Sequence, residues 1–137
     1  MKKTGTLNAQ LSRTIAQMGH SDRLVIGDSG LPIPRGREVI DLALTKNIPT
    51  FIDTVKVVLE ELEVESVVIA SELETMNKRR YEELMEALHA AQINGVKKVP
   101  HEEFKTMTEN GGNIAFVRTG EATPYANVIL IAGVTFD

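Results

Sequence analysis

Residues 19–34 read GHSDRLVIGDSGLPIP, and this stretch indicates the kind of fold. Its middle, Leu24 to Gly27, is a short apolar run that ends in turn signals, which is typical of a buried strand. His20 lies before this predicted strand and Asp28 directly after it. A strand of about five or six residues rises about 3.3 Å per residue, so the two side chains are too far apart to touch directly. We therefore expect His20 either to fold back over the carboxyl end of the strand or to meet Asp28 across a subunit contact.

Apolar runs and helically spaced apolar residues alternate along the whole chain. The runs predict strands at residues 24–27, 38–44, 66–70, 96–99, 114–117 and 128–134, and the helical spacings predict helices at 7–18, 51–62, 81–88 and 101–107. Unbroken apolar strands that alternate with helices indicate a largely parallel sheet. We therefore predict an α/β fold: a single domain over residues 1–137, with about six strands and helices on both faces of the sheet.

The composition excludes several classes of function. The net charge is −4 and no stretch concentrates Lys and Arg, which argues against nucleic acid and anionic membranes as partners. The absence of cysteine excludes disulfides, thiolate nucleophiles and Cys-ligated metals. No apolar stretch approaches the ~20 residues that would span a bilayer, and the polar start of the chain is unlike a signal peptide. The expected location is the cytoplasm.

Asp28 begins a turn that contains Gly30, Pro32 and Pro34. Ligands of open α/β sheets collect beyond the carboxyl ends of the strands, which favours a functional Asp28. The alternative is an Asx turn, in which the side chain bonds local backbone N–H groups. The two prolines hold the chain extended where a phosphate-binding loop would need a helix to start, so the segment does not predict nucleotide binding.

Four further side chains are candidates for a site, and each also has a purely structural interpretation. His20 lies in a loop, where it either acts chemically or bonds the last carbonyls of the preceding helix. His101 is a ligand-binding residue or a plain helix start. On an extended chain Tyr125 and Asn127 project to one side, which suits a polyhydroxylated ligand, or they form a polar turn with Tyr125 partly buried. A metal site of His20, Asp28 and His101 matches no compact ligand motif, so we expect no metal and no cofactor.

Four segments together resemble the family of sugar-ring isomerases that contains the ribose pyranases and L-fucose mutarotases. They are Gly19-His20-x-Asp22, Asp28-x-Gly30-Leu31-Pro32-x-Pro34, His101-Glu102-Glu103-Phe104 and residues 118–127, RTGEATPYAN. The resemblance implies that His20 is the proton donor and that Asp28, His101 and the Tyr125–Asn127 segment bind the sugar. It also implies ring-shaped homo-oligomers, decamers in the pyranases, with sites at subunit contacts.

The reaction that this resemblance implies is interconversion of the pyranose and furanose forms of D-ribose. Ring opening requires a proton delivered to the ring oxygen and another removed from the anomeric hydroxyl. A histidine with an ordinary pKa of about 6.5 can transfer protons near neutrality. Water, Asp28 or His101 could remove the anomeric proton. The alternatives are a mutarotase for another sugar, such as L-fucose, and a non-catalytic sugar-binding subunit.

Overall fold

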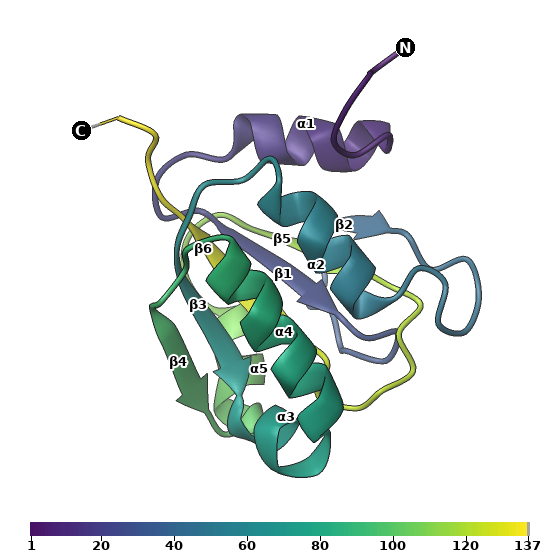
Figure 1. Cartoon of the computed structure of the whole chain (residues 1–137), viewed down its shortest axis with the longest axis vertical. Coiled ribbons are helices and arrows are strands. Elements are labelled where there is room, and N and C mark those ends of the chain that lie inside the picture. Colours follow the sequence, from purple (N-terminus) through teal and green to yellow (C-terminus); the bar gives the residue numbers. More distant parts are fainter. Residues whose placement is uncertain (137) are drawn as a thin grey trace.

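The computed structural model describes residues 1–136 and contains one six-stranded sheet (Figure 1). Its strands are β1 (Arg23–Gly27), β2 (Glu38–Asp41), β3 (Val64–Ala70), β4 (Val96–Val99), β5 (Ile114–Arg118) and β6 (Val128–Ala132), arranged in the order β2-β5-β1-β6-β3-β4. β6 runs antiparallel to both of its neighbours, and the other strand pairs are parallel. The carboxyl ends of β1, β3, β4 and β5 therefore meet at one edge of the sheet, which confirms the largely parallel arrangement.

Helices cover both faces of the sheet, as predicted (Figure 1). They are α1 (Ala9–Gln17), α2 (Phe51–Leu59), α3 (Ser71–Met76), α4 (Lys78–Ala90) and α5 (His101–Glu109). Leu24 and Ile26 of β1 pack with α1, α2 and α4, while Val25 packs with Phe104 of α5 on the opposite face. Because successive side chains of a strand point to opposite faces, burial on both sides requires the unbroken apolar run of β1.

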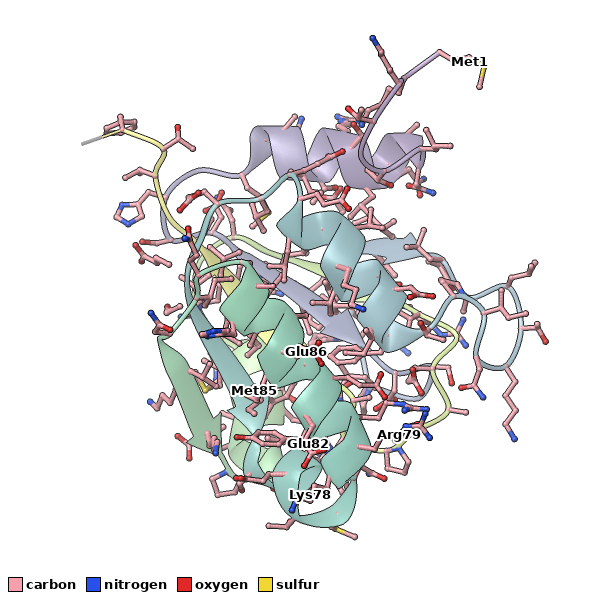
Figure 2. All side chains as sticks on the ribbon, viewed as in Figure 1. Met1, Lys78, Arg79, Glu82, Met85 and Glu86 are labelled. Atoms are coloured by element: carbon pink, nitrogen blue, oxygen red, sulfur yellow. The ribbon has the colours of Figure 1, made fainter. Side chains whose placement is uncertain are left out.

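The outer face of α4 is charged. Lys78, Glu82 and Glu86 project from the exposed side of this helix (Figure 2). Lys78 Nζ lies 4.0 Å from Glu82 Oε1, one helical turn along. Exposed pairs of this kind contribute at most about 0.5 kcal/mol each, so α4 is held mainly by its apolar inner face. No helix within residues 1–136 has both the length and the apolarity needed to cross a membrane.

Several element ends differ from the prediction for local reasons. The first helix begins at Ala9 rather than residue 7, because the Asn8 side chain caps it by accepting the Leu11 N–H at 2.8 Å. β2 stops at Asp41 rather than residue 44, because the Asp41 carboxylate accepts the Ala43 N–H and turns the chain. α3 was not predicted, since Leu73 is its one buried residue and provides no periodic pattern.

Candidate active site

A cavity of about 350 Å³ opens at the carboxyl end of β1. Three segments that are far apart in the sequence line it: the turn at residues 28–32, the first residue of α5, and the loop at residues 121–125. Asp28, His101 and Tyr125 thus come together around one space. The parallel strands explain this convergence, because β1, β4 and β5 all deliver the chain to the same edge.

Asp28 serves as a turn residue and also faces the cavity. Its Oδ1 accepts the Gly30 N–H at 2.9 Å, so the Asx turn is present, and its own N–H donates to Asn127 Oδ1 at 2.8 Å. Burial raises the pKa of the Asp28 carboxyl, although the Gly30 N–H, the Asn127 amide and the nearby His101 act in the opposite direction. The result is a carboxylate that binds a proton more tightly than an ordinary aspartate does.

His101 is positioned by hydrogen bonds to its backbone and by aromatic contacts to its ring. Its N–H donates to both carboxylate oxygens of Glu72, at 3.0 and 3.1 Å. Desolvation pushes the pKa of the Glu72 carboxyl upward, but hydrogen bonds from the His101 and Glu72 backbone N–H groups and the Ser71 hydroxyl, together with the nearby His101, leave the pKa below its usual value. The imidazole meets the Tyr125 ring edge-to-face, with centroids 5.0 Å apart, and stacks with Phe104 at 6.3 Å. The His101 Nδ1 is buried without a hydrogen-bond partner within the described residues, so this ring nitrogen keeps an unused hydrogen-bonding position.

Tyr125 and Asn127 do not lie on an extended chain, and that prediction is wrong. Tyr125 has a φ of 66°, and its carbonyl accepts the Asn127 N–H at 2.8 Å, which turns the chain between the two side chains. The Tyr125 ring lines the cavity, whereas Asn127 is completely buried beside the Asp28 backbone. Pro124 stabilises the turn because its carbonyl accepts the Asn77 Nδ2–H at 2.7 Å.

His20 lies away from this cavity. It occupies the turn between α1 and β1, at the amino end of β1, and its Nε2 lies 2.9 Å from Glu65 Oε2. The five residues of β1 separate the two ends by about 16 Å. The expectation that His20 folds back over the carboxyl end is therefore wrong. The side chain also does not bond the last carbonyls of α1, because its partner is on β3.

The comparisons with known proteins place the chain in a family. Residues 1–135 match the family described as "RbsD / FucU transport protein family". The chain belongs to the RbsD/FucU family. A D-ribose pyranase of Coprothermobacter proteolyticus is 52% identical over 136 residues, which cover 99% of this chain and 100% of that protein. A D-ribose pyranase of Aliivibrio fischeri is 48% identical over 141 residues, again covering 99% and 100% of the two chains.

Two solved structures resemble this RbsD/FucU chain over nearly its whole length. Bacillus subtilis RbsD complexed with D-ribose has a TM-score of 0.90 at 43% identity, covering 99% of this chain and 100% of that one. The fucose mutarotase of Streptococcus pneumoniae in complex with L-fucose has a TM-score of 0.84 at 20% identity, with the same coverage. The second likeness concerns the fold alone. Both agree with the six-stranded architecture described above.

Glu121 is a buried carboxylate that holds the cavity loop of this RbsD/FucU chain in place, and no sequence pattern singled it out. Glu121 is 2% exposed, and its Oε1 accepts the N–H of Phe51, the first residue of α2, at 2.9 Å. Its Oε2 accepts the Thr123 hydroxyl at 2.7 Å, and its backbone carbonyl accepts the Ser29 N–H. Glu121 therefore ties the cavity loop to α2 and to the Asp28 turn. Glu72, which holds the His101 backbone, could have been suspected because it lies two residues after the end of β3.

Gly120 fixes the start of the same loop, and we expect Gly120→Ala to destabilise the protein. A Cβ at this position would lie 2.5 Å from the Ile48 carbonyl oxygen and 2.7 Å from the Ile48 nitrogen. These are backbone atoms, so the loop must move, at a cost of about 1–3 kcal/mol in the free energy of unfolding. Chemical denaturation measures this loss. Gly19→Ala is the matched control, because its Cβ would have only one neighbour, at 3.9 Å. Equal stabilities of the two variants would contradict the packing argument.

No group of three or more His, Asp or Glu side chains suited to holding a metal ion occurs in the part of the chain that the structure describes. His20, Asp28 and His101 in particular are divided between the two ends of β1.

Proposed function

We propose that this chain interconverts the pyranose and furanose forms of D-ribose and is thus a D-ribose pyranase. The observation that carries the proposal is the cavity at the carboxyl end of β1, where Asp28, His101 and Tyr125 surround one space. The relatives support it, because proteins named D-ribose pyranase are about half identical to the chain over their full length. The similar Bacillus subtilis protein has been solved with D-ribose.

The cavity has the chemistry that a pentose requires. Its volume of about 350 Å³ is at the lower end of the range for small-molecule sites. The Tyr125 ring offers a flat apolar wall, and the Asp28 carboxylate and the free His101 Nδ1 offer hydrogen-bonding groups for hydroxyls. We assign sugar binding to these three residues, with Asn127 holding the Asp28 backbone in place.

The proton donor that we propose, His20, must come from a second copy of the chain. Within one copy β1 separates it from Asp28 by about 16 Å, which no rotation of a side chain bridges. A homo-oligomer that sets the amino end of β1 in one copy against the cavity of another would bring the two together. The decamer expected from the family resemblance is the assembly we propose.

Ring opening follows from this arrangement. The protonated His20 imidazole donates a proton to the ring oxygen O5 while the C1–O5 bond breaks. The Asp28 carboxylate accepts the proton of the anomeric hydroxyl, and C1 becomes the carbonyl carbon of the open-chain aldehyde. The raised pKa of Asp28 makes it a stronger base than an ordinary aspartate, which favours this transfer.

Reclosure uses the same two groups in the opposite sense. The O4 hydroxyl attacks C1, and His20, now neutral, accepts the proton of that hydroxyl. Asp28 returns its proton to the former carbonyl oxygen, which becomes the anomeric hydroxyl of the furanose. Both groups finish in their starting protonation states, so the cycle consumes nothing and needs no other reactant.

Saturation-transfer NMR of D-ribose tests this proposal. We expect the protein to accelerate exchange between the pyranose and furanose signals at catalytic concentration. L-Fucose in the same assay provides the comparison, because ring size and anomeric configuration give distinct signals. Faster exchange of the L-fucose anomers alone would indicate a mutarotase for another sugar. Ribose binding without faster exchange would indicate a sugar-binding subunit, and either outcome would contradict the proposed reaction.

A further inference from the structure

The imidazole of His20 makes a directed contact with Glu65. The Nε2 atom lies 2.9 Å from Glu65 Oε2. A carboxylate oxygen accepts hydrogen bonds and does not donate them, so the hydrogen of this contact is on Nε2. The second ring nitrogen, Nδ1, is therefore the one left for other chemistry. The bond at one nitrogen of a histidine determines which proton the other nitrogen carries.

The backbone of β3 brings Glu65 to this position. The pairing between β3 and β6 shifts from Val64 opposite Ala132 to Ser66 opposite Ile131, so Glu65 has no partner in the ladder. A bulge of this kind redirects the side chain of the extra residue. Gly133 leaves room for it, because a Cβ there would lie 3.1 Å from the Glu65 Cβ.

The turn that carries His20 is held at the end of β6, beside Glu65. Ser21 has a φ of 73°, and its N–H donates to the carbonyl of Ala132, the last residue of β6, at 2.9 Å. The Gly19 N–H donates to Asp22 Oδ2 at 2.8 Å and closes the turn. The end of β6 therefore positions both partners: Ala132 holds the His20 turn, and Gly133 lies beside Glu65.

Folding stability does not explain this arrangement. The side chains of His20 and Glu65 are 55% and 45% exposed, and exposed ion pairs of this kind contribute little to stability. Of the neighbouring carboxylates, Asp22 is engaged by Gly19 and by the Asn113 amide, and Glu63 is exposed. Glu65 is the one that faces the imidazole.

We propose that Glu65 is a positioning residue that orients His20 through Nε2, so that Nδ1 exchanges protons with the sugar. This inference rests on the proposed function. During ring opening the imidazolium donates its Nδ1–H to O5, and the Nε2–H stays bonded to Glu65. During closure the lone pair of Nδ1 accepts the proton of the O4 hydroxyl. Without Glu65 the ring rotates freely and its neutral form divides between two tautomers, so fewer encounters are productive.

Three variants separate orientation from charge. We expect Glu65→Ala to lower kcat about 10–100-fold with KM unchanged, the scale known for removal of the partner that orients a metal-bound histidine. Glu65→Gln is expected to keep most of the activity, because its amide oxygen still accepts the Nε2–H. Glu63→Ala removes a neighbouring negative charge without touching the contact and should match the wild type. A Glu65→Ala variant with wild-type kcat, or a Glu65→Gln variant as slow as Glu65→Ala, would overturn the proposal.

A measurement that needs no activity distinguishes this inference from the proposed function. Nitrogen-15 NMR of the imidazole identifies which ring nitrogen carries the hydrogen. We expect neutral His20 to be wholly in the Nε2–H form in the wild type and to become a mixture of tautomers in Glu65→Ala. An unchanged spectrum in that variant would overturn the positioning role. If the wild type fails to accelerate ribose exchange, the proposed function fails, and the spectrum still decides whether Glu65 orients His20.

Discussion

Replacing His20 with alanine is expected to slow pyranose–furanose exchange by about 10²–10⁴-fold, the usual contribution of a general acid–base residue. The reason is that Asp28 acts as the base in the proposed step, so loss of the His20 imidazole leaves the ring oxygen without its assigned proton donor. Ribose binding should persist, because the groups that we assign to it lie at the other end of β1. Exchange NMR measures the rate, and titration of ribose measures the binding.

His89→Ala is the control for this experiment. His89 is an exposed histidine on the last turn of α4, and its loss should leave the exchange rate unchanged. A His20→Ala variant that retains the wild-type rate would show that another group donates the proton. The assignment of the acid would then be wrong, even if the cavity binds ribose.

Asp28→Asn is expected to lower the exchange rate by at least about 10²-fold and to raise the stability of the protein at neutral pH. The rate falls because the amide cannot accept the anomeric proton. The turn survives, because the amide oxygen can still accept the Gly30 N–H. The stability rises because burial raises the pKa of Asp28 above its ordinary value of 3.8, so the ionised carboxylate disfavours the folded state.

The stability that Asp28→Asn gains over the wild type is expected to increase with pH. A carboxyl with a higher pKa in the folded state binds more protons there than in the unfolded state, so its contribution to stability falls as the pH rises between the two values. The extra stability of Asp28→Asn over the wild type should therefore be complete at pH values above the pKa of Asp28 in the folded state. It should disappear below pH 3.8. Thermal denaturation at several pH values measures it. A variant that is less stable than the wild type at pH 7 would contradict the role of burial.

The residues at the carboxyl ends of the strands could be predicted from the sequence. The apolar run of β1 ends directly before Asp28, and only Pro100 separates the end of the short strand β4 from His101. Because parallel strands end at the same edge, both positions could be expected at that edge once the sheet was recognised. The separation between His20 and Asp28 also followed from the length of β1.

The supporting residues could not be predicted in the same way. Glu72 and Glu121 act by accepting backbone N–H groups from residues that are 29 and 70 positions away in the sequence. Such bonds leave no periodic pattern, and nothing in the sequence identifies their donors. The turn at Tyr125 was missed because its left-handed backbone is uncommon for a residue that is not glycine. The bulge at Glu65 likewise depends on the register with β6.

A mixture of two inactive variants tests the central claim, that one copy supplies His20 and another supplies Asp28. His20→Ala and Asp28→Asn are unfolded together in equal amounts, refolded, and assayed by exchange NMR. Random assembly gives about one quarter of the sites an intact histidine and an intact aspartate, so the mixture should recover about a quarter of the wild-type rate. A mixture no faster than the separate variants would contradict the shared site.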